Sequence, residues 1–421
     1  MKFNKRRTLL KVAAGWVVAA GLPGFLPAYA ADRSKPKSAP VWAGFGLNGG
    51  PDQARYELTR RYLQKKRGGV SISDSQAFKF MNDALKEQLT KLTPQLVVFK
   101  PEVKLGEDYL LGMAHDYEAS TAIRRVDLKE PTIDGSIVTF LSGVGLILNY
   151  EKSSGWRIMS SFSFVTRDTR KIPDVSKASE NAVDMLGDSY LVHATAFATF
   201  LGRFGKWNAG YSPNFFARVT SSKVTEGALA QLQEYKLDQK FNADFLGFQA
   251  SAAICDGLDI PLLPFKETDA LANRYATKFS ESLITQDKIA IPNADLEFEV
   301  VLIKATKEKV PSRQQGIIYL KRRIIIGIRI FDRGLPADQQ KILQVVAGAP
   351  EDSDIIRYDQ PDDDNPDRDF VFFDRLLYRT LSGLMKGIAK NDAETITSLG
   401  VNYDSIKDAI PKVLKQCANA R

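Results

Sequence analysis

The chain has 421 residues, of which 44% are hydrophobic and 26% are charged, and its formal net charge is +8. This composition excludes a disordered protein and suffices for one large domain or two ordinary ones, each with its own core. The first 30 residues hold five basic residues and no acidic one, which leaves only +3 of the +8 for residues 31–421, so no nucleic-acid partner is indicated.

The first 30 residues have the three parts of an export signal. A basic start precedes an apolar run from Val12 to Leu26, and small residues follow at Ala28 and Ala30, after which cleavage is expected. The run contains glycine and proline and is short for a bilayer-spanning helix, so a removed signal is favoured over a retained anchor. We therefore predict a periplasmic or secreted protein with no transmembrane anchor after cleavage.

Two export routes are compatible with this start. Arg6 and Arg7 begin the stretch Arg-Arg-Thr-Leu-Leu-Lys, which resembles the twin-arginine signal Ser/Thr-Arg-Arg-x-Phe-Leu-Lys. The sequence departs from that pattern at Lys5 and Leu9, and an ordinary signal of the general secretory route is the alternative. The twin-arginine route often carries proteins loaded with a cofactor, but nothing downstream indicates one.

The first elements after the signal alternate between strands and helices. The patterns predict a strand over 41–47, a basic helix over 52–67, an amphipathic helix over 78–92 and strands over 95–99 and 109–118. His115, Asp116 and Glu118 in the last of these have the residue types of a metal or acid–base site. A polar surface cluster is the alternative, because no second histidine lies nearby.

The clearest pattern in the chain is a β-hairpin from Gly135 to Asp168, with turn residues at 152–155. One face of the hairpin is expected to be apolar: Val138, Phe140, Val144, Leu146, Leu148, Tyr150, Trp156, Ile158, Phe162 and Phe164. The other face carries Thr139, Arg157, Ser161, Ser163 and Arg167 and is expected to be wetter.

The second half of the chain resembles the first, because a strand over 260–265 and a helix over 271–283 precede two long strands. We predict an α+β or α/β fold in two similar halves, 31–205 and 206–421, each a mainly antiparallel or mixed sheet covered by helices. C-terminal helices close the second half. The main one carries an apolar stripe of Phe370, Phe373, Leu377, Leu381, Leu384 and Ile388.

Charges on the two long strands of the second half predict a register. If the hairpin turns at Val310, Glu297 lies opposite Arg323 and Glu299 lies opposite Lys321. Each such exposed cross-strand pair is expected to add a few tenths of a kcal/mol to the stability of the fold.

Part of the second half resembles a known family. Leu262-Leu263-Pro264-Phe265, the helix after it and the later strand pair, about seventy residues between Leu258 and Asp332, resemble the amino-terminal α/β domain of TolB and the related CsgG-like and LpoB-like envelope domains. The glycine-rich strand that usually precedes the last hairpin of that family is not evident. The resemblance implies a non-catalytic envelope module that binds other proteins.

An acidic stretch follows a calcium-loop pattern, in which alternate oxygens converge on a hard cation. The matching residues are Asp363, Asn365, Asp367 and Asp369 at positions 1, 3, 5 and 7, and Asp374 at position 12. Arg368 stands where the loop needs glycine, and Asp374 replaces the bidentate glutamate. The alternative is a solvated acidic loop that caps the following helix, where carboxylates favour the positive end of the dipole.

Only two cysteines occur, Cys255 and Cys417, and their spacing fits no zinc site. They form a disulfide if the chain folds in an oxidising compartment and stay as thiols if it folds before export. No nucleophile or nucleotide motif is present and no cofactor is predicted apart from possible calcium. We therefore expect a non-catalytic envelope protein that binds another envelope protein or a cell-wall component, or alternatively an enzyme or small-ligand receptor with a dispersed site.

Overall fold

A computed structural model of the chain describes residues 39–47, 56–67, 82–83, 86–87, 89–91, 97–100, 103–125, 133–152, 155–187, 204, 215–265, 289–312, 317–348, 352–357 and 366–420. Residues 35–421 group into one compact unit. The predicted signal with Arg6 and Arg7 lies outside the described residues, as do the helix predicted over 271–283 and the boundary between 205 and 206. No helix in the described ranges is long and apolar enough to cross a membrane.

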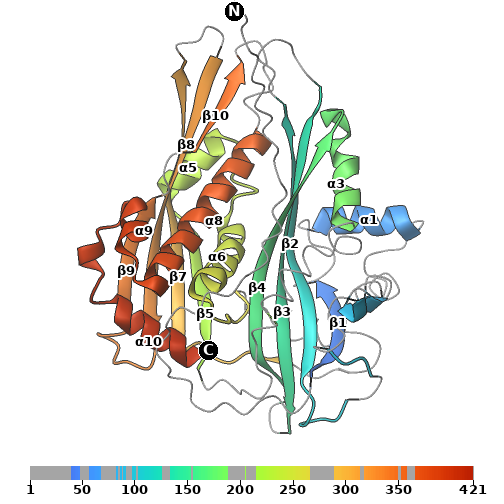
Figure 1. The fold of residues 1–421 in the computed structure, drawn as a ribbon, viewed down its shortest axis with the longest axis vertical. Helices are drawn as coiled ribbons and strands as arrows, with labels where there is room; N and C mark the ends of the chain where they lie inside the picture. Colours follow the sequence, from blue (N-terminus) through green and yellow to red (C-terminus); the bar gives the residue numbers. More distant parts are fainter. Residues whose placement is uncertain are drawn as a thin grey trace, which may run out of the picture. The chain divides into compact units, whose positions relative to one another are not determined.

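The predicted α+β class is confirmed: the described residues form two mixed sheets of five strands each (Figure 1). The first sheet has the order β1-β2-β3-β4-β6, with strands β1 (Val41–Leu47), β2 (Leu110–Arg124), β3 (Gly135–Glu151), β4 (Gly155–Ile172) and β6 (Ile289–Ala290). The second sheet contains β5 (Ala217–Val224), β7 (Leu296–Pro311), β8 (Ile317–Asp332), β9 (Lys341–Gly348) and β10 (Asp352–Arg357). In it, both β9 and β10 pair with β8, β8 pairs with β7, and β7 pairs with β5.

The helices lie against these sheets. Those next to the first sheet are α1 (Glu57–Arg67), the 3-10 turn η2 (Val175–Lys177) and α3 (Ala178–Gly187). Those packed on the second sheet or closing the chain are α5 (Glu226–Glu234), α6 (Ala243–Leu258), α8 (Pro366–Lys390), α9 (Ala393–Ser398), η5 (Tyr403–Ser405) and α10 (Ile410–Ala420). The six residues of the predicted stripe on α8 are all 0–1% exposed, which confirms the closing helix.

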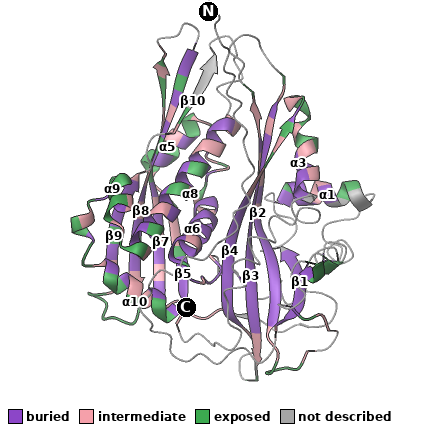
Figure 2. Ribbon diagram, viewed as in Figure 1, coloured by how far each residue is buried: buried purple, intermediate pink, exposed green. Residues whose placement is uncertain are grey.

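The predicted hairpin is β3 and β4, but the expectation of a wetter face is wrong. Ser161 and Ser163, expected on that face, are 1% and 5% exposed and pair with Leu146 and Val144. The strands are buried along most of their length (Figure 2). A second core on the face that α1 and α3 cover contains Ile137, Leu141, Ile147, Phe162 and Phe164. Apolar residues at both odd and even positions, as in β3, are typical of a strand whose two faces are both buried.

A β-bulge explains why Phe162 and Phe164 are not on the face that Trp156 and Ile158 share. Ile147 pairs with Ser160 and the next residue, Leu148, pairs with Ile158, so Met159 is the extra residue. One extra residue moves every later side chain of β4 to the opposite face. Arg167 therefore lies on the side of Phe140, with its guanidinium 5.9 Å from that ring.

The predicted register of the second hairpin is also wrong. The observed pairs are Glu297 with Phe331, Glu299 with Arg329, Thr306 with Arg323 and Glu308 with Lys321. β7 continues to Pro311 and β8 begins at Ile317, beyond the turn assumed at Val310. The residue opposite Glu297 is therefore Phe331 and not Arg323, a shift of eight positions along β8. Because eight is an even number, Glu297 faces the same side of the sheet in the predicted and the observed register.

Residues Leu262 and Leu263, which carry the family resemblance, hydrogen-bond to both sheets. The Leu262 N–H donates to the carbonyl oxygen of Ser161 on β4 (3.1 Å), and the Leu263 N–H donates to that of Ala217 on β5 (2.8 Å). The Ser161 hydroxyl also donates to the Leu262 carbonyl oxygen. This segment therefore satisfies backbone groups of β4 and β5 at once.

Candidate functional site

The predicted calcium ligands are described only in part, because Asp363 and Asn365 lie outside the described residues. The other three carboxylates lie on α8 and each faces different basic side chains: Asp367 faces Lys240, Asp369 faces Lys307 and Arg322, and Asp374 faces Arg167. Within the described ranges, no three histidine, cysteine, aspartate or glutamate residues are placed to hold one metal ion. The calcium loop stays a prediction.

The pair of Arg167 and Asp374 lies between β4 and α8. The Arg167 Nε donates to Asp374 Oδ2 at 2.6 Å, and its Nη2 donates to Gln249 Oε1 on α6 at 3.2 Å. The Asp374 side chain is 0% exposed and that of Arg167 is 26% exposed. Burial raises the pKa of Asp374, and the positive charge of Arg167 opposes that rise. This pair links the two sheets through α6 and α8.

His115 and Glu118, the predicted acid–base residues, do come together. His115 Nε2 lies 3.0 Å from Glu118 Oε2, although residues three apart point to opposite faces of a regular strand. A shift of register between His115 and Tyr117 makes Asp116 the extra residue of a bulge, which brings the two side chains to one face. The other bonds to Glu118 come from the backbone N–H (2.8 Å) and the hydroxyl (2.6 Å) of Thr59 on α1.

This cluster is placed to hold α1 on β2. The side chains of His115 and Glu118 are 0% and 1% exposed. Tyr56 donates from its hydroxyl to the His115 carbonyl oxygen (3.0 Å), and its ring lies 5.5 Å from the imidazole. A substrate would have no access to these groups, so the arrangement indicates a structural role.

The two cysteines are buried, Cys255 on α6 and Cys417 on α10, and the structure holds both as thiols. Both belong to the core between the second sheet and its helices. The disulfide stays a prediction.

The described helices cover one face of the second sheet and leave the other face uncovered. On the covered face lie Phe298, Val300 and Leu302 of β7, Ile326, Ile328 and Ile330 of β8, and Val345 and Ala347 of β9, all of them in the core. The opposite side chains form what is here named the outer face. They are intermediate or exposed in the burial pattern of each strand.

An apolar strip runs across three strands at the centre of the outer face. It consists of Val301 and Ile303 on β7, Ile325 and Gly327 on β8, and Val346 on β9. Val301, Gly327 and Val346 are directly paired neighbours. Ile303 is 36% exposed and Val346 is 50% exposed. Ile303 is the extra residue of a bulge, and its carbonyl oxygen accepts a hydrogen bond from the hydroxyl of Thr225, the N-cap of α5 (3.0 Å).

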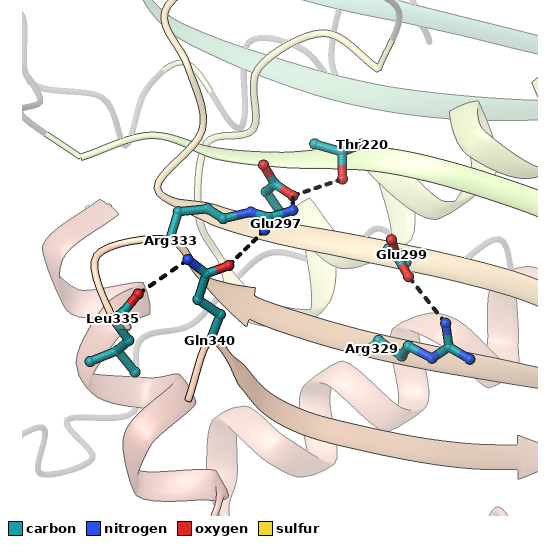
Figure 3. A network of polar contacts seen from close by, with 7 residues as sticks. All are labelled: Thr220, Glu297, Glu299, Arg329, Arg333, Leu335 and Gln340. Atoms are coloured by element: carbon teal, nitrogen blue, oxygen red, sulfur yellow. Dashed lines mark hydrogen bonds and ion pairs between the residues drawn. The ribbon is translucent and has the colours of Figure 1, made fainter. Parts of the chain in front are cut away.

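Charged side chains border the apolar strip at one end. Figure 3 shows the contacts that these side chains make with one another. Glu299 pairs with Arg329 across the β7–β8 ladder at 3.4 Å, and Glu297 pairs with Arg333. Arg333 also donates to Gln340 at 2.7 Å. The hydrogen bond with Glu297 raises the pKa of the Arg333 guanidinium. Arg329 and Arg333 are nearly half exposed, so these pairs contribute little to stability and remain accessible to a partner.

No family model matches the chain. No curated protein matches it either. Among solved structures, a minor lipoprotein from Acinetobacter baumannii is similar over 44% of this chain and 98% of its own length, at 11% identity and a TM-score of 0.16. A similarity of this level carries no argument about fold or function.

Proposed function

We propose that the chain is an exported, non-catalytic protein of the cell envelope that binds another envelope protein through the outer face of its second sheet. The observation that carries the proposal is the apolar strip centred on Gly327, with Ile303 and Val346 exposed on either side of it. Exposed apolar residues that adjoin across strands and are bordered by ion pairs have the composition of a protein interface, whose centre is apolar and whose rim is polar.

The charged border supports the same conclusion. Glu297, Glu299, Arg329 and Arg333 place two negative and two positive side chains at one end of the strip. Exposed pairs of this kind add little to folding, at about 0.2–1 kcal/mol each. They fix the register and the choice of a protein partner through charge complementarity. The predicted export signal supports an envelope location for that partner.

The test uses the mature chain, residues 31–421, as bait for envelope extract. Val346→Lys and Ile303→Lys place a charge in the apolar strip, and each is expected to weaken partner recovery at least about ten-fold, which corresponds to about 1.4 kcal/mol. Leu229→Lys is the matched control, because Leu229 is 39% exposed on α5, on the covered side of the sheet.

The result that supports the proposal is one partner whose recovery falls in both strip variants and is unchanged in Leu229→Lys. Equal recovery in all three variants would contradict it. Elemental and mass analysis of the purified mature chain serves as the second arm. A stoichiometric bound metal or organic cofactor, with no protein partner recovered, would favour the receptor or enzyme class instead.

A further inference from the structure

The second sheet ends at β9 on one side of β8. In the described part of the chain, β9 pairs with β8 alone, and its residues from Leu343 to Ala347 are here named the β9 edge. Native sheets protect such edges with charged residues, proline or bulges, because an unprotected edge is a template for another strand. The β9 edge reads Leu-Gln-Val-Val-Ala and contains none of these, whereas β10, which also pairs with β8, carries Asp352, Asp354 and Arg357.

The direction of the backbone groups on the β9 edge follows from one hydrogen bond. The Gly348 N–H donates to the Leu399 carbonyl oxygen at 2.9 Å, so it points away from β8. Backbone groups alternate in direction along a strand. The N–H and C=O of Gln344 and Val346 therefore also point away from β8, and among the described residues they have no hydrogen-bond partner.

The other end of β9 gives the same directions. The Gln340 carbonyl oxygen accepts from the Asp332 N–H at 2.8 Å, so it points toward β8. Ile342 is the extra residue of a bulge, which reverses the alternation that follows it. Counted from Gln340 through this bulge, residues 343, 345 and 347 bond to β8, and residues 344 and 346 point outward.

The side chains of the β9 edge on the outer face are uncharged. Val346 is 50% exposed and is the last residue of the apolar strip, and its neighbour on that face, Gln344, carries a neutral amide. The alternate residues Leu343, Val345 and Ala347 are buried in the core. A residue opposite Val346 on an added strand would have its Cβ about 4.5–5.5 Å away and would extend the apolar strip to a fourth strand.

We infer that the β9 edge binds an extended, uncharged segment of a partner protein, which adds a strand to the second sheet and places apolar side chains beside Val346. Five residues of strand extend over about 13 Å, at about 3.3 Å per residue, so the edge accommodates four or five residues of such a segment. The inference does not depend on the function proposed above, because the contacts that it requires are those of the β9 backbone.

The composition of the edge selects an uncharged strand. The β9 edge itself holds no ionisable side chain. Lys341, which precedes the edge, donates from its Nζ to the Gln344 amide oxygen at 3.1 Å. A charged side chain opposite Val346 would lose hydration without meeting an opposite charge, whereas an apolar one would cover Val346.

The test measures fluorescence anisotropy of labelled peptides with the mature chain. The first probe alternates valine and threonine over six residues and ends in two lysines for solubility, and two charged probes replace its valines with lysine or with glutamate. The valine probe is expected to bind, and each charged probe at least ten-fold more weakly. Two more probes carry N-methyl groups on alternate residues of the valine probe, one set in each register. At least one of them should bind ten-fold more weakly, because the added strand needs its backbone N–H groups.

A pair of variants locates the binding. Gln344→Pro removes an outward N–H without touching the β8 ladder, which edge strands tolerate, and should weaken binding of the valine probe at least ten-fold. Gln344→Thr keeps the N–H and should bind as the wild type does. Ile303→Lys should also bind as the wild type does, because Ile303 lies on β7, two strands from the edge. Should Gln344→Pro fail to unfold cooperatively, slowed hydrogen exchange at Gln344 and Val346 on addition of the valine probe replaces it.

No binding of the valine probe at millimolar concentration would overturn the inference, and so would equally tight binding of either charged probe. Wild-type binding by a folded Gln344→Pro, undiminished binding of both N-methylated probes, or exchange at Gln344 and Val346 that the probe leaves unchanged would overturn it as well. Loss of the partner in Ile303→Lys with unchanged binding of the valine probe would separate this edge from the outer face.

Discussion

Breaking the buried pair of Arg167 and Asp374 should cost different amounts depending on which partner is removed. Asp374 is completely buried, whereas Arg167 keeps 26% of its side chain exposed. Arg167→Met leaves an interior carboxylate without a counter-charge, at a cost of about 3–5 kcal/mol in the free energy of unfolding. Asp374→Asn leaves a guanidinium that reaches solvent, lies 4.5 Å from the Tyr378 ring and still donates to an amide oxygen, so about 1–2 kcal/mol is expected.

The pH dependence of this difference has a definite sign. Burial raises the pKa of Asp374, and removal of Arg167 takes away the charge that lowers it. A carboxyl whose pKa is higher in the folded state than in the unfolded state binds more protons when folded. Its contribution to stability is then fully present below the unfolded pKa, about 3.9, and is lost as the pH rises through the raised value.

Arg167→Met should therefore regain stability relative to the wild type as the pH falls from 7 toward about 4. Asp374→Asn has no carboxyl to titrate, so its deficit should not shrink. Urea unfolding of the mature chain, followed by tryptophan fluorescence at both pH values, measures these differences. Arg329→Met removes an exposed pair and serves as the control, with a loss of less than about 1 kcal/mol. A larger cost for Asp374→Asn than for Arg167→Met at pH 7, or no pH dependence in Arg167→Met, would refute the reasoning.

Two further changes test the first sheet by urea unfolding. Glu118→Ala removes the carboxylate that contacts the buried imidazole of His115 and the hydroxyl of Thr59, so the free energy of unfolding should fall by at least about 2 kcal/mol. A loss under about 0.5 kcal/mol would contradict the structural role of these contacts. Gly143→Ala places a Cβ 2.6 Å from a carbon of the Phe164 ring and 2.8 Å from the Ala114 carbonyl oxygen, so a loss of about 1–3 kcal/mol in the free energy of unfolding is expected. Its control, Gly227→Ala on α5, meets no atom within 4 Å and should stabilise the protein by up to about 1 kcal/mol. Similar effects of the two changes would contradict the packing described.

The elements themselves could be predicted where a single periodicity runs without interruption. The apolar stripe on α8 repeats at helical spacing from Phe370 to Ile388, and only a helix brings all of its residues to one buried face. The alternation along β3 and β4 likewise predicted that they pair. It did not predict which of their residues are buried, because both faces of the hairpin are covered and a bulge interrupts β4.

Registers and faces could not be predicted in the same way, because bulges reset them. The extra residues Asp116, Met159 and Ile303 each reverse the alternation that follows. Nothing in the types of these residues distinguishes them from regular strand positions. The contact of His115 with Glu118 depends on the bulge at Asp116. The residue types alone indicated a polar cluster, but residues three apart on a regular strand point to opposite faces, so their spacing did not predict the contact.

The outer face has a signal in the sequence of β7. Its apolar residues lie on both faces of the strand, with Val300 and Leu302 on one face and Val301 and Ile303 on the other. In β3 the same feature reflects burial on both sides. In β7 only the first pair is in the core. Sequence alone does not distinguish the two cases, because the difference depends on whether helices cover the second face.

Site-specific photo-crosslinking in intact cells tests the proposed function most directly. A photoreactive amino acid at Val346, the most exposed residue of the apolar strip, should give one discrete adduct with a second envelope protein. The same amino acid at Leu229, on the covered side of the sheet, should give none. Absence of an adduct at Val346, or an adduct of the same mass and yield at both positions, would contradict binding through the outer face.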